Sequence, residues 1–215
     1  MNIQNFNVTG GQNVFATNIE NLVLNQNNKK EDTKDLVKDL LFACSELQSK
    51  KGFHKESENS YNDFIGSILK AKSYQVNLES RKGATLKTGN PGEIDIEILK
   101  EDNSSLAICE GMILPSLNEQ YIKDHILKVF TYDANGLFQN FIIAYINVVN
   151  YGEFVRKYKD LVLRIDYQYP LINAEVKDVS SDYNTGTDMN ILRTLFNRNG
   201  KEVNLYHLLV SMNRQ

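Results

Sequence analysis

The apolar run at 141–149 constrains the fold most, because its nine residues are interrupted only by Asn147. A short run this rich in aliphatic and aromatic side chains is typical of a central strand that is buried on both faces. A helical pattern at 117–132 precedes it, and another apolar segment at 106–114 precedes that helix. The order strand, helix, strand predicts two parallel strands in a mixed sheet covered by helices, which is an α/β fold.

The remaining elements follow from periodicity and turn residues. A helix that begins after Glu31 places Leu36, Leu40, Cys44 and Leu47 on one stripe. Further helices are predicted at 57–71 and 153–163, strands at 74–80 and 93–99, and a C-terminal hairpin with strands at 191–196 and 203–212 around a turn at 197–200. The polar segment 174–190 is predicted to be a loop.

The first 28 residues differ in composition from the rest of the chain. They are rich in Asn and Gln and contain a single charged residue, Glu20. Their spaced apolar residues favour short strands that stack against copies of themselves, so 1–28 is predicted to be a β-prone assembly segment that forms a homo-oligomer. The alternative is a tail that orders only at its edges. Residues 29–215 then form the α/β domain.

Charge and cysteine content exclude few classes of protein. The net charge of −3, from 24 Lys and Arg against 27 Asp and Glu, removes the simplest argument for nucleic-acid binding, although a basic groove remains compatible with it. Cys44 and Cys109 lie far apart in apolar runs, which predicts buried free thiols rather than a disulfide or zinc site.

Several other classes have no supporting sequence pattern. No run approaches 18 apolar residues and the N-terminus lacks a signal core, so we expect a cytoplasmic protein with no membrane partner. Gly83 and Gly89 are not followed by the Lys-Ser/Thr of a P-loop, which weakens an ATPase interpretation. Neither a serine elbow nor a Cys/His pair at family spacing occurs, which weakens esterase and protease interpretations.

Two carboxylates interrupt predicted strands. Alternation at 93–98 places three isoleucines on one face and three acids, Asp95 in the middle, on the other. Glu110 interrupts the apolar segment 106–114. A carboxylate inside a strand requires solvent, a partner or a cation. If the two strands pair as a hairpin, Asp95 and Glu110 converge and offer the hard oxygen ligands that Mg²⁺ prefers.

The two strands carry Gly-Glu-Ile-Asp-Ile-Glu at 92–97 and Glu-Gly-Met at 110–112. Together with the order of the elements, these motifs resemble the restriction-endonuclease-like (PD-(D/E)xK) nuclease core over about 56–150. The resemblance implies a Mg²⁺-dependent (or Mn²⁺-dependent) enzyme that cleaves phosphodiester bonds of DNA. It implies that Asp95 and Glu110 hold the metal. In that superfamily a Lys two residues after the Glu orients or activates the attacking water.

The sequence departs from this pattern at Met112, which stands where the resemblance calls for Lys. A methionine neither polarises water nor offsets charge at a phosphate. The helix at 117–132 offers Lys123 and Lys128 as substitutes, and Lys128 with His125 is the preferred pair. The alternatives are a solvated helix lysine and an ordinary histidine packed beside Tyr121.

Residues outside this core pattern are weaker candidates. Glu58 and Asp63, on the helix before the strands, are candidates for a third carboxylate that reaches the metal through water. Glu79 and the basic pair Arg81 and Lys82 follow the first strand, where a solvated loop is the simpler interpretation.

Two functions from different classes follow. Residues 110–114, 121–128 and 132–136 also resemble nuclease-like domains of bacterial anti-phage defence proteins, which implies a defence nuclease with a partner protein of the same system. The alternative is a nuclease-like fold that lost its chemistry at Met112 and serves as an oligomerising binding or assembly module.

Overall fold

The computed structural model describes residues 36–50, 56–84 and 91–213. The chain divides into two compact units, 1–38 and 39–215, and the β-sheet belongs entirely to the second. The Asn-rich segment 1–28, with the oligomerisation predicted for it, lies outside the described residues.

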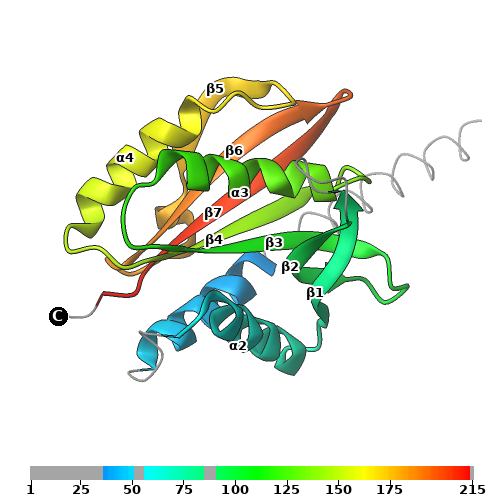
Figure 1. Ribbon diagram of the computed structural model, residues 1–215, viewed down its shortest axis with the longest axis horizontal. Helices are drawn as coiled ribbons and strands as arrows, with labels where there is room; N and C mark the ends of the chain where they lie inside the picture. The colour runs from blue at the N-terminus through cyan, green and yellow to red at the C-terminus, as the bar shows by residue number, and fades with distance from the viewer. Residues whose placement is uncertain (1–35, 51–55, 85–90, 214–215) are drawn as a thin grey trace, which may run out of the picture. The chain divides into compact units, whose positions relative to one another are not determined.

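A seven-stranded mixed sheet organises the second unit (Figure 1). Its strands are β1 (Gln75–Ala84), β2 (Pro91–Leu99), β3 (Ser105–Leu114), β4 (Gln139–Ile146), β5 (Leu171–Asp178), β6 (Met189–Arg198) and β7 (Lys201–Ser211), in the spatial order β1-β2-β3-β4-β7-β6-β5. The pairs β3/β4 and β4/β7 are parallel, and the other neighbours are antiparallel. The predicted α/β class and the parallel pairing of β3 with β4 are confirmed.

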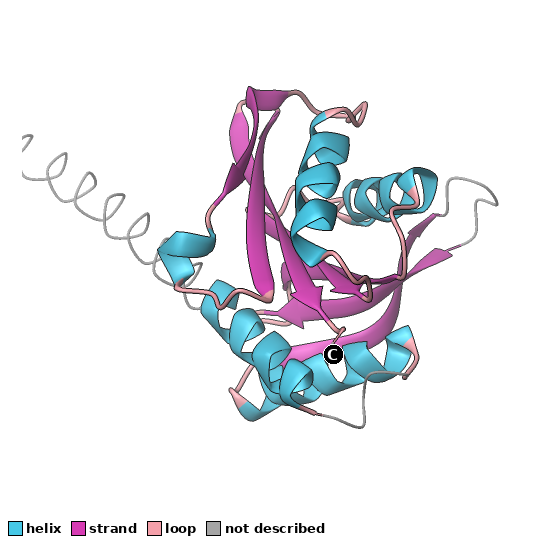
Figure 2. Cartoon of the chain, turned by 90° about the vertical axis from the view of Figure 1, so that its left-hand side faces the viewer, coloured by secondary structure: helices cyan, strands magenta, loops and turns pink. Residues whose placement is uncertain are grey.

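Helices cover both faces of this sheet (Figures 1 and 2). Residues 36–49 are helical, followed by α2 (Glu58–Ala71), α3 (Glu119–Tyr132), α4 (Tyr151–Leu163) and a short 3-10 helix, η1 (Ser180–Tyr183). The side chains of Ser57, Asn118 and Asn150 cap α2, α3 and α4 by accepting a bond from the N–H three residues on. Within the described ranges, no helix combines the length and the apolar character needed to cross a membrane.

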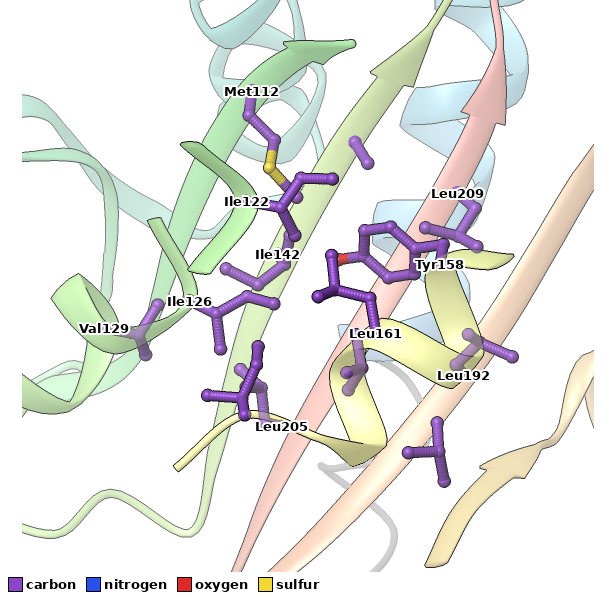
Figure 3. Packing of buried hydrophobic residues seen from close by; sticks show 14 of the residues in the cluster. Met112, Ile122, Ile126, Val129, Ile142, Tyr158, Leu161, Leu192, Leu205 and Leu209 are labelled. Atoms are coloured by element: carbon purple, nitrogen blue, oxygen red, sulfur yellow. The ribbon is translucent and has the colours of Figure 1, made fainter. Parts of the chain in front are cut away.

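The main hydrophobic core lies between the sheet and the helices α3 and α4 (Figure 3). Buried side chains from both helices meet residues of the central strands there, among them Met112, Ile122, Ile126, Val129, Ile142, Tyr158, Leu161, Leu192, Leu205 and Leu209. Met112 has no exposed surface, and its side chain lies beside Ile122. Position 112 therefore belongs to the core and is unavailable for polar chemistry.

The opposite face of β3 packs closely on α2. The carboxamide of Asn62, on α2, accepts a bond of 2.9 Å from the hydroxyl of Tyr145 and lies directly against the Cα of Gly111. A Cβ at position 111 would collide with that carboxamide. Glycine between Glu110 and Met112 therefore permits the close approach of helix to strand.

Two predicted boundaries are wrong in the C-terminal region. The segment 174–190, predicted to be a loop, contains most of β5 and all of η1. β5 is an edge strand that pairs only with β6, and its register shifts where Asn173 and Ala174 take positive φ, so it lacks the alternation that reveals buried strands. The hairpin turn is shorter than predicted, because Arg198 pairs with Lys201 and leaves only Asn199-Gly200, both with positive φ.

The Gly111→Ala variant should be less stable than the parent protein by about 1–3 kcal/mol, because the new methyl group must displace the buried Asn62 carboxamide. Gly152→Ala is the matched control, since its Cβ on α4 meets no atom within 4 Å and alanine favours a helix. Urea unfolding of the two variants measures the difference. Equal stabilities would contradict the close packing at Gly111.

Candidate active site

The two carboxylates singled out by the sequence lie on adjacent strands. β2 and β3 pair antiparallel with Ile96 opposite Cys109, so Asp95 and Glu110 each stand one residue beyond that pair. The backbone N–H of Gly111 donates a 2.7 Å hydrogen bond to Asp95 Oδ2, which fixes this carboxylate against β3. The predicted hairpin therefore brings the two acids together.

The ammonium group of Lys128 joins them from α3. Its Nζ lies 2.7 Å from Glu110 Oε2 and 3.9 Å from Asp95 Oδ1. The same Nζ lies 5.3 Å from the centre of the Tyr132 ring, one helical turn further along α3. Lys123, the other candidate lysine of this helix, makes no ion pair with either acid in the described part of the chain.

Burial differs sharply among the three charged groups. The side chain of Glu110 is 0% exposed, that of Asp95 17% and that of Lys128 31%. Glu110 Oε2 has the ion pair, whereas Oε1 is buried with no hydrogen-bond partner among the described residues. A buried polar atom without a partner is unfavourable by about 1–3 kcal/mol, so this oxygen is available to a cation.

The pKa values of the three charged groups reflect their burial. Burial, reinforced by the negative charge of Asp95, raises the pKa of Glu110 to about 8 even though the Lys128 ion pair opposes this shift. Burial also raises the pKa of Asp95, against the opposing effects of Lys128 and the Gly111 N–H. Burial alone would lower the pKa of Lys128, but Glu110 and Asp95 outweigh it and the net pKa of the ammonium is raised.

His125 lies one turn before Lys128 on α3, with its ring centre 4.1 Å from that of Tyr121. Its Nδ1 lies 3.0 Å from the carbonyl oxygen of Tyr121. Because a carbonyl oxygen only accepts, Nδ1 carries the hydrogen, and in the neutral ring Nε2 carries the lone pair. The neutral imidazole is therefore held in the tautomer whose Nε2 accepts a proton or a hydrogen bond.

Glu58 on α2 is a third carboxylate near this cluster. Its Oε2 accepts hydrogen bonds from the Ile113 N–H at 3.2 Å and from the Tyr121 hydroxyl at 3.3 Å. Burial first, and then the nearby charge of Asp95, raise the pKa of Glu58. Asp63 is exposed on the same helix. The side chains of Glu79, Arg81 and Lys82 lie outside the described ones.

The donor set is compatible with a hard divalent ion. Asp95 and Glu110 supply carboxylate oxygens, and both oxygens of Glu110 are buried without a hydrogen-bond partner among the described residues, Oε2 having only its ion pair with Lys128. Within the described ranges, no group of three or more His, Cys, Asp or Glu side chains is placed to hold a metal. Mg²⁺ typically uses one or two carboxylates and keeps several waters, so two acids satisfy what it requires from the protein.

The sequence alone did not identify Asn62, which supports the site from α2. Asn62 packs against Gly111, the residue that follows Glu110, and so fixes the position of β3. The available signal was the glycine itself, because a glycine inside an apolar strand marks a close approach of another segment. The sequence does not reveal which segment approaches.

Comparison of the chain with protein-family models, with curated proteins and with solved structures gives no match. The functional conclusion therefore depends on the chemistry of the described residues together with the resemblance of the sequence to a nuclease core.

The stability of the metal-free protein should fall as pH rises from about 5 to about 8 because of Glu110. An unfolded glutamate has a pKa near 4.5, whereas that of Glu110 is raised to about 8. Between these values the folded state retains a proton that the unfolded state has released, so unfolding becomes easier by up to about 1.4 kcal/mol per pH unit. Urea unfolding in EDTA at several pH values measures this slope.

Glu110→Gln should flatten that dependence, because the amide has no proton to release. Glu101→Gln, at an exposed position, is the control and should retain the slope of the parent protein. Parallel curves for the parent and Glu110→Gln would contradict the raised pKa.

Proposed function

We propose that this protein is a Mg²⁺-dependent nuclease with a restriction-endonuclease-like fold that hydrolyses phosphodiester bonds of DNA. The supporting observation is the cluster on β2, β3 and α3, in which Lys128 Nζ lies 2.7 Å from Glu110 and 3.9 Å from Asp95. Two carboxylates beside one ammonium group provide both a place for a divalent cation and a positive charge for a phosphate.

The order of elements supports the same proposal. The chain runs through α2, three antiparallel strands β1 to β3, the crossover helix α3 and the parallel strand β4. This is the series of elements on which the sequence resemblance rests, and the acids lie on its second and third strands. A β-hairpin followed by a parallel crossover places both acids beside the helix that carries Lys128.

Each residue of the cluster has a distinct role in this proposal. Asp95 and Glu110 would hold the ion, which when bound supplies Lewis-acid activation of water and phosphate. Lys128 donates to the non-bridging oxygens of the phosphate and offsets the charge that develops there. His125, through its Nε2 lone pair, accepts the proton that the attacking water releases.

In this proposal Lys128 takes the place of the lysine that the superfamily pattern has at position 112, where this chain has Met. Met112 is buried in the core beside Ile122, so a longer charged side chain at this position would have to enter apolar packing. A lysine on α3 reaches the two carboxylates. The positive charge that the pattern puts at position 112 is thus supplied by Lys128, which is distant in the sequence but close to Glu110 in the fold.

The biological setting is part of the same proposal. The resemblance to nuclease-like domains of anti-phage proteins supports a cytoplasmic defence nuclease that works with a partner protein of its system. The composition of residues 1–28 supports a homo-oligomer formed through that segment.

The burial of Met112 favours a second candidate, a catalytically degenerate fold that acts as a binding or assembly module. In that case Lys128 and the two acids form a structural ion cluster. The candidates differ in one measurable property, since only the nuclease needs a divalent cation at Asp95 and Glu110.

The parent protein should cleave plasmid and oligonucleotide DNA in the presence of Mg²⁺ or Mn²⁺. Glu110→Gln and Lys128→Ala should each lose at least about a hundredfold in rate, which is the usual effect of removing one group that stabilises transition-state charge. Lys123→Ala, with the same charge change on the same helix, should retain activity. Cleavage of RNA instead of DNA would revise the substrate, and full activity of Glu110→Gln would reject the site.

Mg²⁺ or Mn²⁺ should raise the thermal melting temperature of the parent protein, because an ion that binds only the folded state stabilises it by mass action. At a concentration one hundred times Kd the gain is about 2.7 kcal/mol. Asp95→Asn should remove the shift, whereas Asp102→Asn at an exposed turn should leave it unchanged. A melting temperature insensitive to metal would favour the assembly module.

A further inference from the structure

The ammonium group of Lys128 binds the same oxygens that a divalent ion would use. Its Nζ lies 2.7 Å from Glu110 Oε2 and 3.9 Å from Asp95 Oδ1, so a single cation bridges both acids. Among the described residues, Lys128 is the only Lys, Arg or His ion-paired with either acid. Without an ion, Lys128 is therefore the cation that faces the buried Glu110.

We propose that Lys128 is a built-in competitor of the divalent ion, so that the ion binds tightly only when the lysine leaves the two acids. This inference rests on the proposed function, since it concerns the same metal site. It makes Lys128 a regulator of metal affinity in addition to its role at the phosphate.

The geometry favours exchange between the two cations. A divalent ion between Asp95 and Glu110 would stand within a few ångströms of the ammonium group, and two cations at that distance repel each other strongly in a poorly solvated site. The carboxylate of Glu110 is fully buried and fixed on β3, whereas the lysine side chain is 31% exposed. The mobile partner is therefore Lys128, whose flexible four-carbon stem can carry its charge toward solvent.

A bound phosphate provides a place for the displaced ammonium. The Tyr132 ring already lies 5.3 Å from Nζ while the lysine is paired with Glu110, so it is not the destination of the displaced group. A phosphate diester of the substrate offers a full negative charge. Substrate and metal should then favour each other's binding, because the phosphate draws away the lysine that competes with the metal. The site would stay weakly loaded until nucleic acid arrives.

The test is the affinity of the full chain for Mn²⁺ alone, measured by isothermal titration calorimetry without nucleic acid. Lys128→Gln keeps a hydrogen-bond donor beside Glu110 but removes the competing charge, and should bind Mn²⁺ about tenfold or more tightly than the parent protein. Lys128→Met serves as a second variant with an uncharged side chain of similar length. Lys123→Gln is the control for the lost charge on α3 and should bind like the parent.

The outcomes separate this inference from the proposed function. Equal or weaker binding of Mn²⁺ by both Lys128 variants would overturn the competition while leaving the metal site in place. Absence of Mn²⁺ binding in the parent and in both Lys128 variants would overturn the metal site, and with it the proposed function. Tighter binding by the Lys128 variants but not by Lys123→Gln supports the competition.

A second measurement uses the parent protein and does not depend on the folding of a variant. Acylation of lysine amines by an activated ester, followed by mass spectrometry, reports how accessible and reactive each lysine amine is. Addition of Mg²⁺ in place of EDTA should increase the modification of Lys128 several-fold, with Lys123 on the same helix as the internal reference. Unchanged modification of Lys128 under saturating Mg²⁺ would overturn the displacement.

Discussion

A carboxylate buried in the middle of an otherwise apolar strand is the constraint on which the arrangement around β3 depends. Glu110 has no exposed surface, and a charge in such surroundings is tolerated only when a cation or hydrogen-bond donors compensate for its lost hydration. Lys128 supplies the compensation from α3 at 2.7 Å. Because α3 connects β3 to β4, the ion pair helps to fix how the crossover helix lies over the strand that precedes it.

β3 carries a different kind of contact on each face. On one face Gly111 admits the carboxamide of Asn62 from α2, and on the other Met112 packs beside Ile122 of α3. Glu110, two residues before Met112 on the same strand, lies within reach of the lysine on the crossover helix. Tight packing on both sides of β3 holds the carboxylate still, which is what a site with fixed ligands requires.

Local charge describes this site better than the charge of the whole chain. The net charge of −3 over 215 residues discouraged a nucleic-acid interpretation, yet two acids, Asp95 and Glu110, are paired with one lysine on neighbouring elements. Such a cluster attracts cations whatever the total charge. A divalent ion would reverse the local sign and make the same place attractive to phosphate.

The sequence by itself determined the α/β class, the order of the strands and helices apart from β5 and η1, and which two strand acids converge, because each of these leaves a local periodic pattern or interrupts one. It left open whether Lys123 or Lys128 serves the site, since both are ordinary helix lysines in the sequence. It also failed at β5, because an edge strand needs only one neighbour and little apolar alternation. The tertiary structure alone placed Lys128 on Glu110 and Asn62 against Gly111. These contacts join residues 18 and 49 positions apart, and no local pattern encodes a distance between elements that packing brings together.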